Sequence, residues 1–141
     1  SARSRIYLAM ALRMAGRHVE ALATLAEARE RLETYTRAQV PHYAATTETY
    51  LAYEVARVLL GMGRPRDALV SAAFADGSAR RAGLLWPRPG VLRTAVWARR
   101  ALGESEAAEI AELEALASRA PFVRTFLDEA RAPIREDGLV Y

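Results

Sequence analysis

Apolar side chains recur at helical spacing along most of the chain. Between residues 18 and 37 the apolar positions fall mostly three and four apart, at Ala21, Leu22, Leu25, Ala28 and Leu32. Residues at these spacings lie on one face of a helix, which predicts an amphipathic helix with a buried stripe. Comparable patterns predict helices at about residues 2–15, 18–37, 43–62, 65–82, 91–102, 105–120 and 122–131. Alanine, the best helix former, is abundant, and the sequence therefore predicts an all-α fold.

A turn glycine followed by two small helix residues occurs three times, with the alanines always five and twelve positions after the glycine. The sets are Gly16, Ala21 and Ala28; Gly63, Ala68 and Ala75; and Gly103, Ala108 and Ala115. Glycine accepts the left-handed conformation that ends a helix, and alanine lets two backbones approach closely. The register resembles that of tetratricopeptide repeats and predicts a helix-turn-helix solenoid with pairs at about 2–37, 43–82 and 91–120. A closing helix at 122–131 is expected to cap the last pair.

Proline, glycine and serine mark the expected boundaries. Pro41 ends the second helical run, because proline lacks an N–H and restricts the preceding residue, Val40. Pro65 suits the first position of the fourth helix. The Trp-Pro-Arg-Pro-Gly stretch at 86–90 predicts a loop, and Ser105 is a candidate N-cap for the sixth helix. After a polar tail the chain ends at residue 141, and we expect residues 1–141 to be a single domain and a fragment of a longer protein.

The amino-acid composition limits the cellular compartment and the kinds of disulfide or metal site to be expected. All twenty basic residues are arginine, and the chain contains no cysteine. Codon usage in a GC-rich genome or selection for bidentate anion binding would each explain the arginines. The lack of cysteine excludes disulfides and thiolate metal sites. No apolar run reaches the roughly 18 residues needed to span a membrane, and no signal peptide is visible, so we expect a cytoplasmic protein with no membrane partner.

Charge is unevenly distributed. Residues 57–100 hold nine arginines and two acidic residues, whereas residues 101–141 hold four arginines and nine acidic residues. This distribution favours anionic partners over the middle of the chain and cationic partners near its end. A polyanion-binding protein is usually more uniformly basic, so we expect no direct nucleic-acid binding by this segment.

No residue pattern points to catalysis. The chain lacks the G-x-x-x-x-G-K-[ST] loop that binds nucleotide phosphates. His18 and His42 stand alone, whereas a zinc site needs three or four convergent ligands. The acidic residues between Glu104 and Glu114 have no nucleophile or histidine beside them and are expected to form a solvated face. We therefore expect no enzyme activity, no metal site and no cofactor.

Arginines and aromatic residues share faces of the predicted first helices, which line the concave groove in tetratricopeptide solenoids. The candidate groove residues are Met10 and Arg13 in the first pair, Tyr50, Tyr53 and Arg57 in the second, and Arg93, Trp97 and Arg100 in the third. Their spacings of three, four and seven place each set on one helix face. Guanidinium groups beside rings suit a small anionic or hydroxyl-rich effector, or a peptide or protein partner. Alternatively, Tyr53 and Trp97 pack between repeats while the arginines are solvated.

The segment from Ala120 to Pro133, APFVRTFLDEARAP, resembles the end of the helical-repeat region in large LuxR-type ATPase transcription regulators, the family of the maltotriose-responsive activator. In that family an aromatic-Val-Arg run, then Phe-Leu/Val-Asp-Glu-Gly and a proline, closes the repeats just before a DNA-binding helix-turn-helix. The matching positions here are Phe122, Val123, Arg124, Phe126, Leu127, Asp128 and Glu129. Pro121 and Ala130 stand where the family usually has glycine, and the proline comes one residue late.

The resemblance implies a sensor and coupling domain of a transcription regulator. In such regulators the repeats are thought to receive an effector or a partner protein, and the signal controls an ATPase switch and oligomerisation. The ATPase and DNA-binding domains would lie outside this chain. Asp128 and Glu129 are then expected to be structural or interfacial. The alternative is a stand-alone tetratricopeptide-type scaffold that binds a peptide or partner protein through the same groove.

Overall fold

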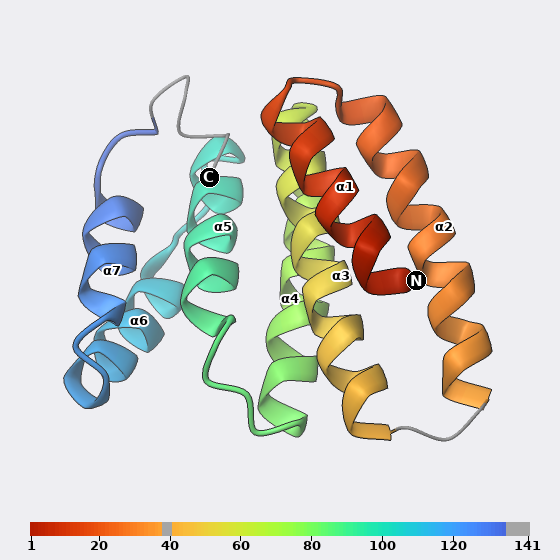
Figure 1. Ribbon diagram of the computed structural model, residues 1–141. Coiled ribbons are helices and arrows are strands. Elements are labelled where there is room, and N and C mark those ends of the chain that lie inside the picture. The colour runs from red at the N-terminus through yellow and green to blue at the C-terminus, as the bar shows by residue number, and fades with distance from the viewer. Residues whose placement is uncertain (38–40, 135–141) are drawn as a thin grey trace.

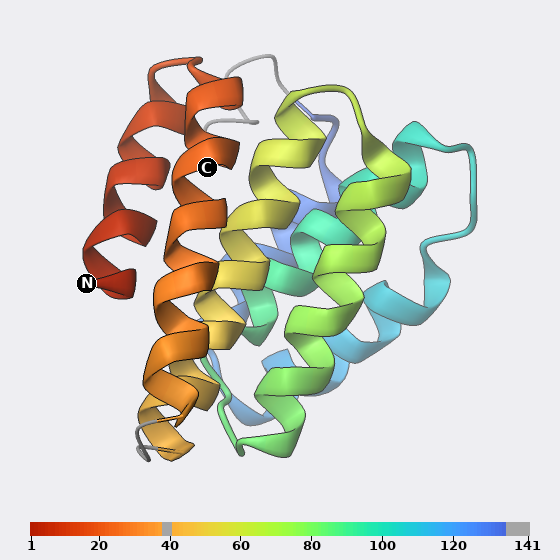
Figure 2. The same cartoon turned by 90° about the vertical axis from the view of Figure 1, so that its right-hand side faces the viewer.

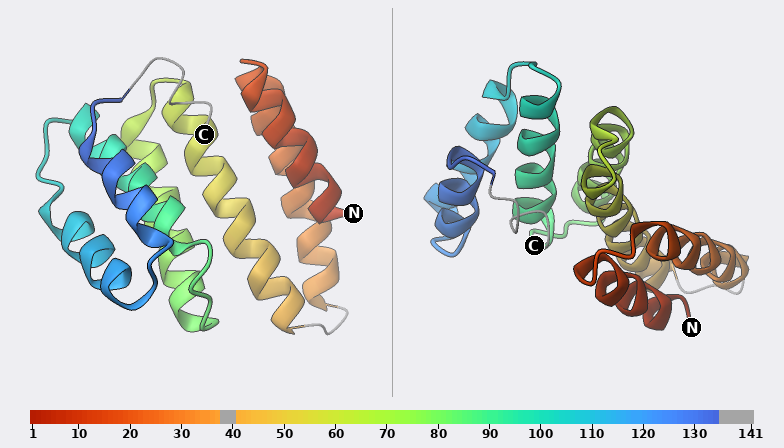
Figure 3. Two further views of the ribbon diagram at one scale, coloured as in Figure 1. Left: turned by 60° about the vertical axis from the view of Figure 1, so that its left-hand side comes forward. Right: turned by 90° about the horizontal axis from the view of Figure 1, so that it is seen from above.

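The computed structural model describes residues 1–37 and 41–134, and within them the chain forms seven helices and no strand (Figure 1). The helices are α1 (Ala2–Met14), α2 (His18–Arg37), α3 (Pro41–Gly61), α4 (Pro65–Arg81), α5 (Arg88–Ala101), α6 (Ala107–Arg119) and α7 (Val123–Arg131). They follow one another across the molecule in chain order, from α1 and α2 at one end to α6 and α7 at the other (Figures 1 and 3). The predicted all-α class is confirmed.

The three predicted turn glycines each end a helix in the same way. Gly16, Gly63 and Gly103 have φ values of 78°, 74° and 69°, in the left-handed region that glycine enters without strain. The residue after each of them donates its N–H to the carbonyl five positions earlier, at 2.8 to 2.9 Å. This is the Schellman arrangement, which satisfies carbonyls left without partners at a helix end. Gly83 ends α4 with the same geometry.

The alanines of the first two sets are buried at helix contacts, but those of the third set are not. In the first two sets, Ala21, Ala28, Ala68 and Ala75 are all fully buried. Ala108 and Ala115 are exposed, because α6 packs through Leu113 and Leu116 instead, and these leucines belong to a core shared with α5 and α7. The expectation that alanines mark a close helix approach is therefore wrong for the third pair.

The predicted loop at 86–90 is shorter in the structure. α5 begins at Arg88, so Pro89 and Gly90 lie in its first turn. The N–H groups of a first turn have no acceptor within the helix, so proline, which lacks an N–H, is tolerated there. Arg88 holds this turn against its neighbours. Its Nε donates to Asp76 Oδ1 on α4 at 2.8 Å, and its Nη2 donates to Glu112 Oε1 on α6 at 2.6 Å.

Two other boundaries differ from the sequence prediction. α3 begins at Pro41, two residues before the predicted start, because proline is favourable at the first helical position. The N-cap of α6 is Glu106, without a side-chain bond, whereas Ser105 only accepts the N–H of Ala107 at 3.3 Å. The predicted break at Val40 and the tail from residue 135 lie outside the described residues.

α7 covers the apolar end of α5 and α6, as predicted for the closing helix. Val123 and Leu127 are buried in one core with Leu113 and Val96. Phe126 packs against the same core, whereas Phe122 is 45% exposed. α2, α3 and α4 lie side by side in chain order (Figure 2). None of the helices in the described ranges has the length and apolar character needed to cross a bilayer.

Candidate functional site

A groove of about 700 Å³ runs over the first helices, and we call it the first-helix groove. Its lining includes Tyr7 and Met10 of α1, Thr47, Tyr50, Tyr53, Glu54 and Arg57 of α3, Arg93 of α5, Phe126 and Glu129 of α7, and Trp86 of the loop before α5. Five of the eight predicted groove residues are among them, namely Met10, Tyr50, Tyr53, Arg57 and Arg93. The same-face spacing on α3 therefore places its three candidates in one hollow.

Arg57 lies at the groove with few partners. Its guanidinium stacks over the ring of Tyr53, with 5.0 Å between Cζ and the ring centroid. Its Nη1 lies 3.6 Å from Glu54 Oε2, which is an ion pair longer than a hydrogen bond. The buried Nε has no hydrogen-bond partner among the described residues. Burial lowers the pKa of Arg57, although that of an arginine stays far above neutral pH.

Tyr53 lies against α5 because residue 90 is glycine. A Cβ built at Gly90 would stand 2.2 Å from the Tyr53 hydroxyl oxygen and 2.7 Å from Cζ. Such distances are far below van der Waals contact, so only glycine leaves room for this ring. The close approach joins α3 to α5 and fixes the ring on which Arg57 stacks. The same Gly90 appears in the sequence only as part of a predicted loop.

Arg13 is not a groove residue, contrary to prediction. Its side chain is fully buried, and its Nε donates to Glu54 Oε1 at 2.5 Å. The end of α1 packs against α3, so this guanidinium faces the neighbouring helix rather than the hollow. Glu54 therefore serves two arginines, with Arg13 close and Arg57 distant.

Arg93 lines the groove but is held by the protein itself. Its Nη1 donates to Glu129 Oε2 on α7 at 2.5 Å. Its Cζ lies 5.0 Å from the centroid of the Trp97 ring and 4.9 Å from that of Phe126. Trp97 is itself only 5% exposed and belongs to the core, so it packs between helices rather than facing the groove. For Trp97 the structure agrees with the alternative given by the sequence analysis, in which this ring packs in the interior instead of lining the groove.

Arg100 lies outside the groove, which corrects the third member of its predicted set. It donates to the backbone carbonyls of Ala130 at 2.6 Å and Ala132 at 2.7 Å, and it pairs with Glu106. Carbonyls in the last turn of a helix lack internal partners, and a cation there also meets the negative end of the helix dipole. Arg100 thus fixes the C-terminal end of α7 to α5.

Sequence reasoning missed several groove residues. Thr47 continues the α3 face three positions before Tyr50, and its buried hydroxyl has no hydrogen-bond partner in the described part of the chain. Residues three apart share a helix face, so helical spacing alone could have predicted that Thr47 lies on the same face as Tyr50. Phe126 and Glu129 come from α7, which packs beside α5, and no local spacing shows that contact. Trp86 lies at the groove with its ring 5.6 Å from that of Phe126.

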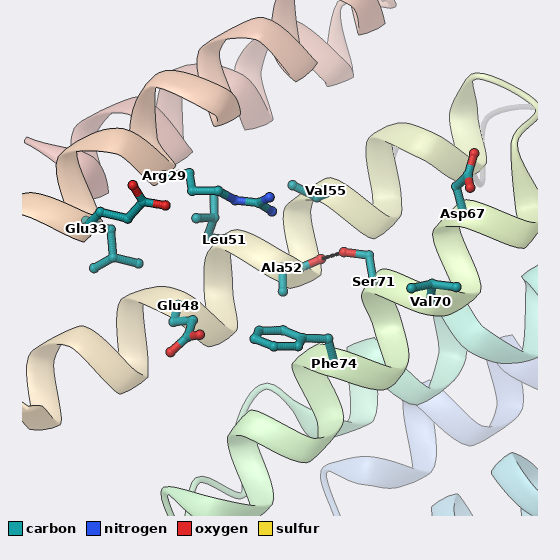
Figure 4. A pocket seen from close by; sticks show the side chains of 11 residues that line it. Arg29, Glu33, Glu48, Leu51, Ala52, Val55, Asp67, Val70, Ser71 and Phe74 are labelled. Atoms are coloured by element: carbon teal, nitrogen blue, oxygen red, sulfur yellow. Dashed lines mark hydrogen bonds between the residues drawn. The ribbon is translucent and has the colours of Figure 1, made fainter. Parts of the chain in front are cut away.

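A second hollow of about 500 Å³ lies where α2, α3 and α4 meet (Figure 4). Phe74 and Val70 of α4 flank it, and Ser71 donates to the Ala52 carbonyl at 2.7 Å. Its charged rim consists of Arg29, Glu33, Glu48 and Asp67. Within the described residues it contains no buried side-chain donor or acceptor without a partner, unlike the first-helix groove. The first-helix groove is therefore the better candidate for directional recognition.

The described residues include no cluster of three or more histidine, cysteine or acidic side chains that could hold a metal ion. Comparison with family models, with curated proteins and with solved structures finds nothing that matches this chain.

Proposed function

We propose that this chain is a tetratricopeptide-like binding and coupling domain of a transcription regulator, cytoplasmic and without enzyme activity of its own. The first-helix groove receives a small anionic or hydroxyl-rich effector, or a peptide or protein partner. The resemblance of residues 120–133 to the closing segment of LuxR-type ATPase regulators supports the regulator assignment. The repeated Schellman turns at Gly16, Gly63 and Gly103, and a groove lying on the first helices, support the solenoid assignment.

One observation carries the coupling role: α7 supplies part of the groove wall. Phe126 and Glu129 line the same hollow as Tyr50 and Arg57, which come from α3. α7 is also the helix that bears the resemblance to the regulators. A ligand in the groove therefore contacts the repeats and the helix that closes them at once.

The contacts of α7 allow a ligand in the groove to change how this helix is held. Its buried side is apolar, through Val123 and Leu127, but the groove side rests on the ion pair between Arg93 and Glu129. The Glu129 side chain is 39% exposed whereas that of Arg93 is 7% exposed, so a hydroxyl or a cationic group of a ligand can reach Glu129 and compete with Arg93 for it. Displacing or reinforcing this pair changes how firmly α7 is held on α5. Binding energy is thereby converted into a change in α7.

A thermal-shift screen of the purified domain against sugars, phosphates, carboxylates and peptides tests the binding role. A ligand that binds the folded state raises the melting temperature, by an amount that grows with the logarithm of its concentration divided by its dissociation constant. Hydrogen exchange with the best ligand bound then tests the coupling role. We expect the amides of α7 to change protection together with those of α3. Protection changing only around α2 and α4 would place the site in the second hollow instead.

The coding sequence on either side of this segment separates the two functional readings. An ATPase domain before it and a helix-turn-helix domain after it support the regulator. A chain without these neighbours supports a stand-alone scaffold that binds its partner through the same groove.

A further inference from the structure

The four arginines predicted for the groove differ in how fully the protein already uses them. Arg13 is buried against Glu54, and Arg100 is bonded to the end of α7. Arg93 is paired with Glu129 and stacked on two rings. Among the described residues, Arg57 has only the 3.6 Å ion pair with Glu54 and the stack on Tyr53.

Glu54 is a weak partner for Arg57 because it is committed elsewhere. Its Oε1 lies 2.5 Å from Arg13 Nε, and this bond fixes the carboxylate toward α1. A guanidinium presents five N–H donors, and Arg57 makes no hydrogen bond among the described residues. Its side chain is only 15% exposed, so water satisfies these donors poorly. An acceptor brought by a ligand would supply what the protein leaves out.

Three tyrosine rings line the groove together with Arg57. Tyr53 forms the ring beneath its guanidinium, and Tyr50 stands one helical turn earlier on α3. Burial raises the pKa of Tyr50, so its hydroxyl stays neutral at physiological pH. Tyr7 of α1 faces the same hollow and is 61% exposed. These rings offer stacking surfaces for a planar body.

The charges of the groove argue against a multiply charged anion. Arg3, Arg57 and Arg93 line it beside Glu54 and Glu129, so the formal charge of the lining is +1, and a phosphate dianion would exceed that charge. A carboxylate carries one charge, and its two oxygens match the planar fork of a guanidinium. A neutral sugar would leave Arg57 with only the carboxylate of Glu54, 3.6 Å away, as a counter-charge among the described residues.

We propose that the first-helix groove binds an aromatic monocarboxylate, with its carboxylate on Arg57 and its ring among Tyr7, Tyr50 and Tyr53. The hydroxyl of Thr47, which is buried and has no partner among the described residues, offers a further donor near the ring. This assignment rests on the groove being the binding site of the proposed function, and it names the chemical class of the ligand.

The test uses three acids, phenylacetate, 1-naphthoate and indole-3-carboxylate, each beside its own primary amide. Binding is measured at neutral pH by calorimetry and by the arginine Nε–H signals in NMR spectra. The Arg57 signal is assigned by its loss in Arg57→Gln. We expect at least one acid to bind about tenfold or more tighter than its amide and to shift that signal, because hydrogen bonds to charged groups are worth about that factor.

Substitutions then separate charge from geometry. Arg57→Gln should abolish the difference between acid and amide, and Arg57→Lys should restore only part of it, since lysine lacks the planar fork. Arg124→Gln is the matched control, because Arg124 is exposed on the far side of α7 from the groove and should leave binding unchanged. Melting temperatures of all three variants show whether each is folded.

Two results overturn the assignment. Equal binding of every acid and its amide, or no binding by any of them, excludes the carboxylate. Acid binding that survives in folded Arg57→Gln excludes Arg57 as its partner. Either result leaves the proposed function standing if a sugar, inorganic phosphate or a peptide perturbs the groove and α7. The proposed function fails separately, when no ligand class changes either region.

Discussion

Arg13 on α1 and Glu54 on α3 form a buried ion pair with 2.5 Å between Nε and Oε1, although 41 residues separate them in the chain. The pair fixes the first helix of one pair to the first helix of the next. It also turns the Glu54 carboxylate away from Arg57, and so leaves the guanidinium at the groove short of acceptors.

Loss of Arg13 should be costly for stability. Arg13→Met leaves the Glu54 carboxylate buried beside one distant cation, and breaking a buried pair typically costs about 3–5 kcal/mol. Urea unfolding measures the change. The control is Arg5→Met, also on α1, whose partner Glu27 is 60% exposed, so its pair should contribute less than about 1 kcal/mol. Equal effects of the two substitutions would show that the buried pair does not hold α1 to α3.

Gly90 should resist even the smallest side chain. Gly90→Ala places a Cβ 2.2 Å from the Tyr53 hydroxyl and should destabilise the fold by about 1–3 kcal/mol. Gly77→Ala is the matched control within α4, because its Cβ would meet only Arg81 Nη1 at 3.3 Å, the end of a flexible side chain. Alanine at that helical position should stabilise by about 0.5–1 kcal/mol. Thermal unfolding of both variants measures these two changes in stability. A stabilising Gly90→Ala would contradict the close approach of Tyr53.

Two alanines at equivalent positions of their repeats should respond differently to enlargement. Ala68→Leu adds about three heavy atoms to a fully buried site and should cost about 1–3 kcal/mol. Ala108→Leu adds the same side chain to an exposed face of α6 and should change the free energy of unfolding by less than about 0.5 kcal/mol. Similar losses at both sites in urea unfolding would mean that α6 packs through its alanines after all.

Acid should weaken the contact between α5 and α6. The hydrogen bond from Arg88 lowers the pKa of Glu112 below its ordinary value. A carboxyl group with a lowered pKa in the folded state stabilises the protein above its unfolded pKa, and this contribution is lost as pH falls through the folded pKa. Glu112→Gln should therefore lower the melting temperature at neutral pH, and the difference from the parent should shrink on acidification.

The control for this pH dependence is Glu48→Gln. Glu48 is exposed and makes no ion pair within the described ranges, so its replacement should leave the neutral melting temperature nearly unchanged. A Glu112→Gln difference that stays constant from neutral to acid pH would show that packing, rather than charge, is what the substitution disturbs.

Local chemistry made the helices and turns predictable. A left-handed glycine followed by a Schellman bond is decided within six residues, and it recurs at Gly16, Gly63 and Gly103. The burial of the alanines was predictable only where helices lie on both sides. α6 has its neighbours on its leucine side, so Ala108 faces solvent although the local pattern is the same as at Ala68.

The same distinction, between features decided within one helix and contacts made between helices, applies to the candidate site. The face shared by Tyr50, Tyr53 and Arg57 follows from helix periodicity within one element, and the structure places all three at the groove. The partners of Arg13 and Arg93 lie 41 and 36 residues away, on other helices. Spacing carries no information about such contacts, so the sequence could not show that these two guanidinium groups are already used by the fold.

The unequal exposure of the two tryptophans gives the protein a built-in optical readout. Trp86 is 51% exposed at the groove, and Trp97 is 5% exposed in the core. Replacing Trp97 with phenylalanine leaves a single indole whose fluorescence reports what enters the groove, and replacing Trp86 leaves one that reports the opening of the core. Ligand binding and unfolding can thus be followed separately, by emitted light alone and without any attached dye.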